Sequence, residues 1–145
     1  MAENSEKLSE PLEDYLETIA ALSAESGFAR ITDIAAAMSV KKPSVSSALN
    51  VLAERGLVEY AKYKPVVLTA RGESLAQNVR RKHELLRNFF TSFLGVDAAE
   101  ADLAACKMEH ALADHIMDKL VAFLKDINMP SSPSAKKLKR GLRAK

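Results

Sequence analysis

Three residues with metal-binding side chains fall within five consecutive positions of the sequence. Cys106, Glu109 and His110 stand at positions i, i+3 and i+4. On a helix their side chains share one face, because residues three and four apart are neighbours on its surface. A thiolate, a carboxylate and an imidazole at this spacing can bind one divalent transition metal. A half-buried cysteine beside a surface glutamate and histidine gives the same pattern without a metal.

Other candidate ligands lie in two further segments. His83 interrupts an apolar helical stripe between Val79 and Leu86, where an imidazole needs either a hydrogen bond or a metal. Asp14 and Glu17 form an i, i+3 pair near the N-terminus and either face solvent or contribute carboxylates to a metal. These segments surround one or two cations only if the fold brings them together, which spacing alone does not establish.

A second group of residues is suited to binding DNA. Small polar and basic residues begin one predicted helix, and lysines occupy the tip of the hairpin predicted after it. They reach base edges and phosphates when the helix N-terminus enters a major groove. The candidate DNA-binding residues are Lys41, Lys42, Pro43, Ser44, Ser46, Ser47, Lys62 and Lys64. Any one lysine alone is as well explained by solvation, and the group does not identify the bases.

Apolar residues at helical spacing predict three helices before these lysines. The helices run from Ser9 to Gly27, from a Thr32 cap to Met38, and from Pro43 to Gly56. Two β-type runs, at 57–60 and 66–68, then predict a hairpin. Two short helices followed by a basic-tipped hairpin form the order of a winged helix-turn-helix.

The second half of the sequence predicts a helical domain. Thr69 begins a long helix that ends at Gly95, and its wide apolar face requires a partner. Asp97 and Asp114 are the predicted caps of two further helices. We therefore expect a mainly α protein with a winged helix-turn-helix DNA-binding domain at 1–72, an α-helical dimerisation and metal-binding domain at 73–130, and a disordered basic tail at 131–145.

Composition and charge limit the function classes. The 145 residues are 48% hydrophobic, but the apolar runs are too short to cross a membrane. A polar N-terminus and a single cysteine agree with a cytoplasmic location. Six of the 21 basic residues follow Asp126, which leaves 15 basic against 19 acidic residues before that point. DNA binding by this acidic body requires clustered basic residues or bound cations.

Six motifs in order resemble the metal-dependent repressors typified by the diphtheria toxin repressor and the manganese transport regulator. They are Glu13-Asp14-Tyr15-Leu16-Glu17, Pro43-Ser44-Val45-Ser46 after an alanine-rich helix, Val67-Leu68-Thr69 ahead of Gly72, Arg81-Lys82-His83-Glu84-Leu85-Leu86, Leu94-Gly95-Val96, and Cys106-x-x-Glu109-His110. The resemblance implies a homodimer that represses transcription by binding a double-stranded DNA operator, activated by a divalent metal, and so controls metal homeostasis.

The resemblance also implies roles by position. The main metal ligands would be Asp14, Cys106, Glu109 and His110, with Glu17 and His83 at an adjacent site. Residues 42–47 would face the major groove, and residues 62–64 would make the wing contacts. Metal would tie the first helix to the dimer core, so that metal and DNA each raise the affinity for the other.

Four residues depart from the family patterns. The manganese branch usually has a bridging carboxylate at Cys106, and the iron branch has methionine at Asp14. Arg87 and Asp102 stand near further ligands of the iron branch and weaken the prediction of its ancillary site. A thiolate favours Fe²⁺, Co²⁺ or Zn²⁺, whereas a carboxylate suits Mn²⁺ or Fe²⁺. We expect Fe²⁺ or Mn²⁺ as the cofactor, with Co²⁺, Ni²⁺ or Zn²⁺ binding in vitro and the number of ions open.

Two other function classes fit parts of the sequence. One is a metal-independent winged-helix regulator that responds to a small ligand or to oxidation of Cys106. The other is a metalloenzyme, because Cys, His and Glu ligands can activate water. The sequence contains no His-Glu-x-x-His, paired Cys-x-x-Cys, nucleophile-elbow or Gly-rich phosphate-loop motif. We therefore expect a repressor rather than an enzyme.

Overall fold

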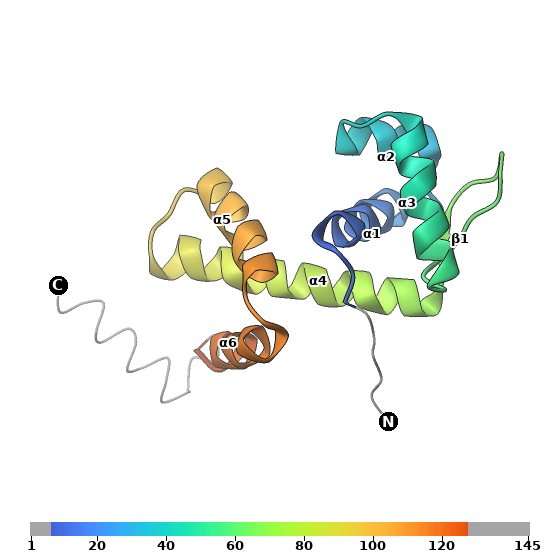
Figure 1. Ribbon diagram of the computed structural model, residues 1–145. Coiled ribbons are helices and arrows are strands. Elements are labelled where there is room, and N and C mark those ends of the chain that lie inside the picture. The colour runs from blue at the N-terminus through green and yellow to red at the C-terminus, as the bar shows by residue number, and fades with distance from the viewer. Residues whose placement is uncertain (1–6, 128–145) are drawn as a thin grey trace, which may run out of the picture. The chain divides into compact units, whose positions relative to one another are not determined.

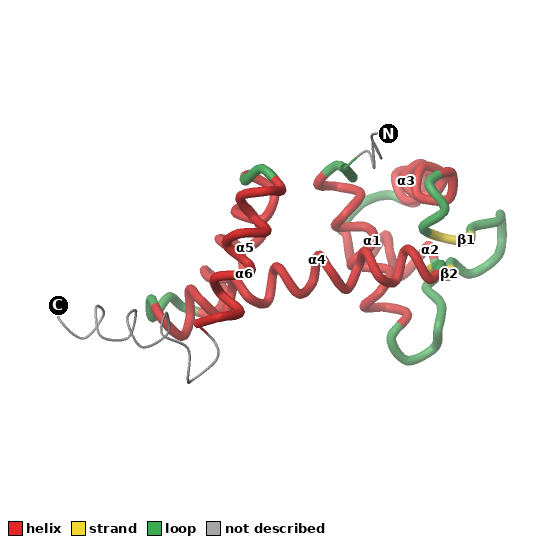
Figure 2. The backbone as a smooth tube through the Cα atoms, turned by 90° about the horizontal axis from the view of Figure 1, so that it is seen from below, coloured by secondary structure: helices red, strands yellow, loops and turns green. Residues whose placement is uncertain are grey.

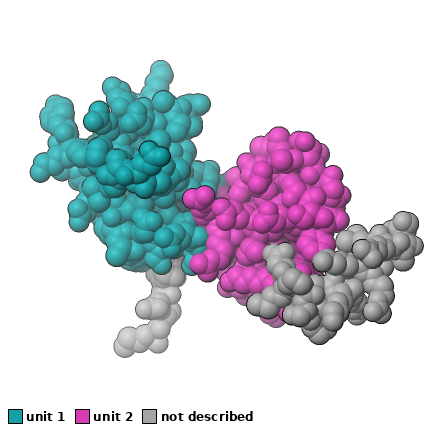
Figure 3. All heavy atoms as spheres, turned by 180° about the vertical axis from the view of Figure 1, so that it is seen from behind, with its two compact units in different colours: residues 1–79 teal, residues 80–145 magenta. Residues whose placement is uncertain are grey.

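The computed structural model describes residues 7–127, and the chain divides into two compact units at 1–79 and 80–145 (Figure 3). The elements in chain order are α1 (Glu10–Ser23), α2 (Ile31–Met38), α3 (Lys42–Glu54), β1 (Val58–Glu59), β2 (Val67–Leu68), α4 (Ala70–Asn88), the π-helical turn η1 (Phe89–Phe93), α5 (Ala98–Ala111) and α6 (Asp114–Ile127) (Figure 1). The predicted mainly α class is confirmed. The predicted tail at 131–145 lies outside the described residues.

The first unit packs α1, α2, α3 and the hairpin around one apolar core. Val45, Leu49 and Leu52 are fully buried, so the predicted apolar stripe of α3 is confirmed. Leu16 and Ile19 of α1 are buried in the same cluster. Burying such a side chain contributes roughly 1.5–3 kcal/mol. This packing fixes the orientation of α3 and leaves the start of the helix exposed.

The turn between α2 and α3 is tight. Ser39 adopts a left-handed conformation with φ 55°, and its backbone N–H donates to the carbonyls of Ala35 and Ala36 in the last turn of α2. Pro43 lies in the first turn of α3, where a missing N–H costs nothing. The predicted Thr32 cap is wrong, because Arg30 is the N-cap and Thr32 lies inside the helix. The helix begins two residues earlier than a Thr32 cap requires, because half-buried Ile31 packs against the core.

The hairpin is anchored at its base to the segment before α2. β1 and β2 pair antiparallel, with Val58 opposite Leu68. Beyond this pair, Ala29 and Val66 exchange two backbone hydrogen bonds of 2.8 and 2.7 Å. The loop between the strands is green in Figure 2. Tyr63 lies near the middle of this loop, is 92% exposed and has a φ of 66°. The wing is therefore short, and its base is fixed while its tip faces solvent.

Thr69 joins the hairpin to α4, as predicted. Its hydroxyl donates to the carbonyl of Gly56 at 2.7 Å and accepts from the N–H of Gly72 at 3.0 Å. Gly72 lies so close to Leu57 that a Cβ at this position would be 1.9 Å from the Leu57 carbonyl oxygen. The first turn of α4 packs so closely against the Leu57 backbone that only glycine fits at position 72.

The second unit has its own core, to which α4, η1, α5 and α6 contribute. Its buried members are Leu86, Ala105, Met117, Val121, Leu124 and Ile127. The sequence predicts a single helix to Gly95, but its last residues form the π turn η1. The wider turn lets Phe89, Phe90 and Phe93 pack against the same cluster. Gly95 then adopts a φ of 68° and the chain leaves the helix.

The starts of α5 and α6 test the two predicted caps. The Asp97 carboxylate accepts a hydrogen bond from the N–H of Ala99 at 3.1 Å, which confirms this cap. α6 begins at Asp114 itself, so the predicted cap is one residue late. The carbonyl of Ala113 accepts hydrogen bonds from the N–H groups of Ile116 and Met117. Starting the helix there places the Met117 side chain in the core.

Large apolar side chains remain exposed on the second unit. Leu94 is 50% exposed, Leu103 67%, Ile116 46% and Phe123 43%. Singly exposed apolar side chains are common on folded proteins, whereas a contiguous patch of them marks a surface that another protein covers. None of the described helices has the length and apolar character needed to span a membrane.

Candidate metal centre and DNA-binding surface

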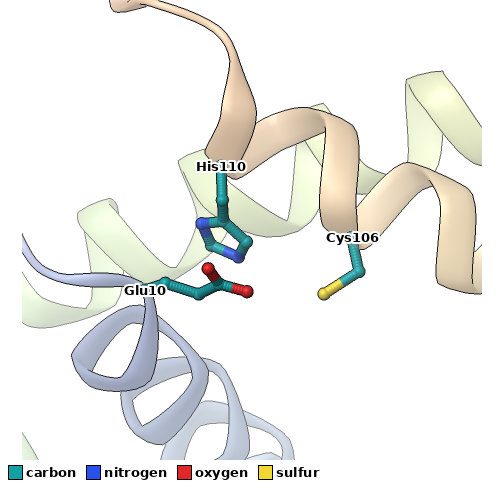
Figure 4. A group of neighbouring side chains, drawn as sticks. All are labelled: Glu10, Cys106 and His110. Carbon is teal, nitrogen blue, oxygen red and sulfur yellow. The ribbon is translucent and has the colours of Figure 1, made fainter.

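α5 positions three of the predicted metal ligands on one side. Ala101 and Ala105 of this helix are fully buried and hold it against the second unit. Cys106 and His110, one turn apart, project from the same side of α5 (Figure 4). The Sγ of Cys106 lies within 4.8 Å of a ring nitrogen of His110. Glu10, also drawn in Figure 4, is a residue of α1 in the other unit.

Glu109 lies between two imidazoles, with its side chain only 4% exposed. Its Oε1 is 3.4 Å from Nε2 of His110, and its Oε2 is 3.6 Å from Nδ1 of His83. Both separations exceed the usual length of about 2.9 Å for an N–H···O hydrogen bond. They match two ligands that contact one ion at about 2.1 Å each. Together with the Cys106 thiol nearby, these residues fit a transition-metal ion.

His83 is held by a residue that the sequence analysis did not include among the ligands. Its Nε2 lies 2.7 Å from Oδ1 of Asp102 on α5, and the Nε of Arg87 lies 3.5 Å from the same oxygen. This contact supplies the hydrogen bond that an imidazole in the apolar stripe of α4 needs. The spacing of Asp102, Cys106 and Glu109 at i, i+4 and i+7 was the available signal, because it places all three on one face.

The structure places the six predicted ligands on two compact units. His83, Cys106, Glu109 and His110 belong to the second unit and lie near one another there. Asp14 and Glu17 lie half-buried on α1 in the first unit, on either side of buried Tyr15 and Leu16. Their role as metal ligands stays a prediction.

The predicted DNA-binding residues lie at the start of α3 and on the wing. Lys41 is the N-cap of α3, and Lys42, Pro43, Ser44 and Ser47 follow with exposed side chains, while Ser46 is half-buried. Lys62 and Lys64 are exposed in the hairpin loop. The free backbone N–H groups of a helix N-terminus attract phosphate, and the lysines add to this attraction. Their contacts with DNA stay predictions.

One residue beside the wing, Arg30, was not assigned from the sequence. Arg30 and Tyr63 line a groove of about 410 Å³ together with Phe28, Ile31, Thr32, Lys64 and Pro65. The Arg30 guanidinium lies over the Phe28 ring at 6.0 Å, and the Lys62 ammonium over the Tyr63 ring at 5.1 Å. Arg30 reaches the wing through the Ala29–Val66 bridge, which no local sequence signal reveals.

Comparison with known protein families matches both halves of the chain. Residues 7–66 match the iron-dependent repressor N-terminal DNA-binding domain, and residues 69–133 match the metal-binding and dimerisation domain of the same family. An HTH-type transcriptional regulator of Methanocaldococcus jannaschii is 34% identical over 118 residues, which are 81% of this chain and 94% of that protein. The transcriptional regulator MntR of Escherichia coli is 40% identical over 114 residues, 79% of this chain and 73% of its own.

Solved structures show the same similarity. The manganese regulator SloR superimposes with a TM-score of 0.65 at 34% identity, covering 79% of this chain and 53% of its own. A manganese-dependent transcriptional repressor in complex with manganese gives a TM-score of 0.66 at 30% identity over 79% of this chain and 52% of its own. The chain thus spans about half the length of these solved structures. Its two matched domains, in order and over most of the chain, show that it belongs to the iron-dependent repressor family of metal-dependent transcriptional regulators.

Proposed function

We propose that this protein is a divalent-metal-activated repressor that binds operator DNA as a homodimer and controls metal homeostasis. The observation that carries the proposal is the buried Glu109 carboxylate, one oxygen of which faces His83 at 3.6 Å and the other His110 at 3.4 Å, separations that suit a cation between the two groups of each pair. The match of residues 69–133 to a metal-binding and dimerisation domain supports the same conclusion. The winged helix-turn-helix supplies the DNA-binding surface.

The proposed ligands combine three kinds of donor. In the second unit, His83 and His110 donate nitrogen, Glu109 donates oxygen and Cys106 donates sulfur, while Asp14 and Glu17 remain ligands implied by the family resemblance. Fe²⁺ accepts all three donors, and Mn²⁺ is named in relatives of this chain. We therefore propose Fe²⁺ or Mn²⁺ as the cofactor of a cytoplasmic regulator. The bound cation would supply positive charge among acidic side chains.

Metal and DNA are proposed to be linked. If Asp14 or Glu17 contributes a ligand to the cation, metal binding couples the DNA-binding unit to the metal-binding unit. DNA then raises the affinity for metal by the same factor by which metal raises the affinity for DNA. Without the cation, the acidic ligands repel one another, which opposes that coupled state.

Chelation provides the direct test. The probe is a duplex selected from a random library by the metal-loaded full chain, and fluorescence anisotropy measures its affinity. Removing the metal is expected to weaken binding by about 5–150-fold, the range typical of coupled sites. Mn²⁺ or Fe²⁺, added without oxygen, should restore the affinity, whereas Mg²⁺ should not, because it prefers all-oxygen ligands.

The rival functions give different results in this experiment. Operator affinity that is the same before and after chelation contradicts the proposal and favours a regulator that responds to a small ligand or to Cys106 oxidation. A hydrolytic activity that chelation removes, without an effect on DNA affinity, favours a metalloenzyme. Anaerobic calorimetry with Fe²⁺ and Mn²⁺ separately then measures which ion binds more tightly.

The wing lysines make a separate prediction about affinity and salt. Lys64→Gln is expected to weaken binding to all duplexes alike, because a phosphate contact carries no base information. It should also reduce the slope of log affinity against log salt concentration by about 1 for each protomer, or about 2 for the homodimer. The matched control is Lys125→Gln, an exposed position on α6 in the other unit. An unchanged slope in Lys64→Gln would show that this lysine does not contact phosphate.

A further inference from the structure

The two ring nitrogens of His83 face different carboxylates at different distances. Nε2 lies 2.7 Å from Oδ1 of Asp102, whereas Nδ1 lies 3.6 Å from Oε2 of Glu109. The first is the length of a strong hydrogen bond to an ionised acceptor. The second is too long for a hydrogen bond. The imidazole is therefore hydrogen-bonded at one edge and open to another kind of contact at the other.

The short contact determines which nitrogen of His83 carries the proton. A carboxylate only accepts hydrogen bonds, so the proton in this contact belongs to Nε2. In the neutral imidazole the other nitrogen, Nδ1, then keeps its lone pair. That lone pair is on the side of Glu109, which is the most central of the four candidate ligands in this unit. His83 thus presents a metal-binding atom toward the Glu109 carboxylate.

Arg87 and solvent distinguish Asp102 from the metal ligands. The Arg87 Nε lies 3.5 Å from the Asp102 oxygen that His83 contacts, so this carboxylate already has a cationic partner. The Asp102 side chain is 58% exposed, whereas that of Glu109 is 4% exposed. Asp102 therefore lies on the solvent side of the imidazole, and Glu109 lies on its protein side.

We propose that Asp102 is a positioning residue that fixes His83 as the Nε2–H tautomer, so that Nδ1 binds the metal ion beside Glu109. Metal-binding histidines commonly donate their second N–H to a carboxylate, which fixes the ring and strengthens the ligand. Asp102 acts through His83 and does not itself bind the ion, because Arg87 satisfies its charge. This inference rests on the proposed function, since it concerns the same metal centre.

The test combines metal affinity with the tautomer of His83 in the full chain. Asp102→Ala is expected to raise the Kd for Mn²⁺ by about 10–100-fold in calorimetry without DNA, the usual effect of removing such a partner. In the metal-free protein, long-range ¹H–¹⁵N spectra should change from the Nε2–H tautomer to a mixture. The sequence has only three histidines, so single His→Gln variants assign the signals.

Two variants separate positioning from charge. Asp102→Asn keeps an oxygen that accepts from Nε2 but removes the charge, so it should retain most of the wild-type tautomer and affinity. Asp118→Ala removes another exposed carboxylate of the same unit, which pairs with Lys82 on α4. It should leave both measurements unchanged. If Asp102→Asn instead loses as much affinity as Asp102→Ala, the charge of Asp102 matters and the positioning role is wrong.

The outcomes distinguish this inference from the proposed function. If the wild-type chain binds Mn²⁺ and Asp102→Ala binds it equally well, the positioning role fails and the proposed function stands. If the wild-type chain binds neither Mn²⁺ nor Fe²⁺, the proposed function fails and the inference fails with it. A wild-type His83 that is already protonated on Nδ1 overturns the inference whatever the metal affinity.

Discussion

Glu109→Ala is expected to abolish metal-activated DNA binding. Its two carboxylate oxygens lie 3.4 and 3.6 Å from the imidazoles of His110 and His83, so removing them deletes the central ligand. Residues that only support a ligand cost about 10–100-fold in metal affinity when replaced, so the loss here should exceed about 100-fold. Calorimetry with Mn²⁺ and anisotropy with the selected duplex measure the two consequences directly.

A matched variant on the same helix provides the control. Glu100→Ala removes an exposed carboxylate from the first turn of α5 and should leave metal affinity unchanged. Circular dichroism should show that Glu109→Ala keeps its helices, because alanine favours helix and Glu109 lies in the last turn of α5. A Glu109→Ala protein that still binds the duplex more tightly when Mn²⁺ is added would show that the metal centre is elsewhere.

Gly72→Ala is expected to cause the largest loss of stability among single substitutions at the hairpin. The added Cβ would lie 1.9 Å from the Leu57 carbonyl oxygen and 2.9 Å from its carbon, and both atoms belong to the backbone. Relief requires the start of α4 to move away from the strand β1, which disrupts the Thr69 hydrogen bonds. The free energy of unfolding should fall by about 3 kcal/mol or more, as measured by urea denaturation.

The neighbouring Ser74→Ala variant separates this clash from a general effect of alanine. Ser74 is exposed on α4, two residues further along, and alanine favours helix, so its stability should be unchanged or slightly higher. Gly72→Ala should also weaken DNA binding, because the strands of the wing leave their place beside α4. An unfolding midpoint for Gly72→Ala equal to that of Ser74→Ala would contradict the close approach.

Local signals in the sequence predicted most of the first unit. The stripe of Val45, Leu49 and Leu52 identified α3, because an apolar repeat within one helix depends on few distant residues. Helix starts were less accurate, since tertiary packing decides them: Arg30 rather than Thr32 caps α2, because Ile31 contacts the core. The π turn η1 was not predicted, because it depends on where three phenylalanines meet the other helices.

The candidate metal centre was predictable to the extent that its residues lie on one helix. The spacing of Cys106, Glu109 and His110 depends only on α5 being helical, and the structure places them together. The contact between His83 and Asp102 depends on how α4 packs against α5, which no local pattern contains. Arg30 was missed for the same reason, because a bridge between distant segments brings it to the wing.

The exposed apolar side chains of the second unit have a consequence for mass action. If Leu94, Leu103, Ile116 and Phe123 are covered when two copies associate, dilution removes the species that binds DNA. Below the dimer dissociation constant, occupancy of an operator then rises with the square of the protein concentration. Operator occupancy in a cell containing few copies would therefore depend more steeply on copy number than it does at high concentration, and Phe123→Ser should extend this quadratic regime upward.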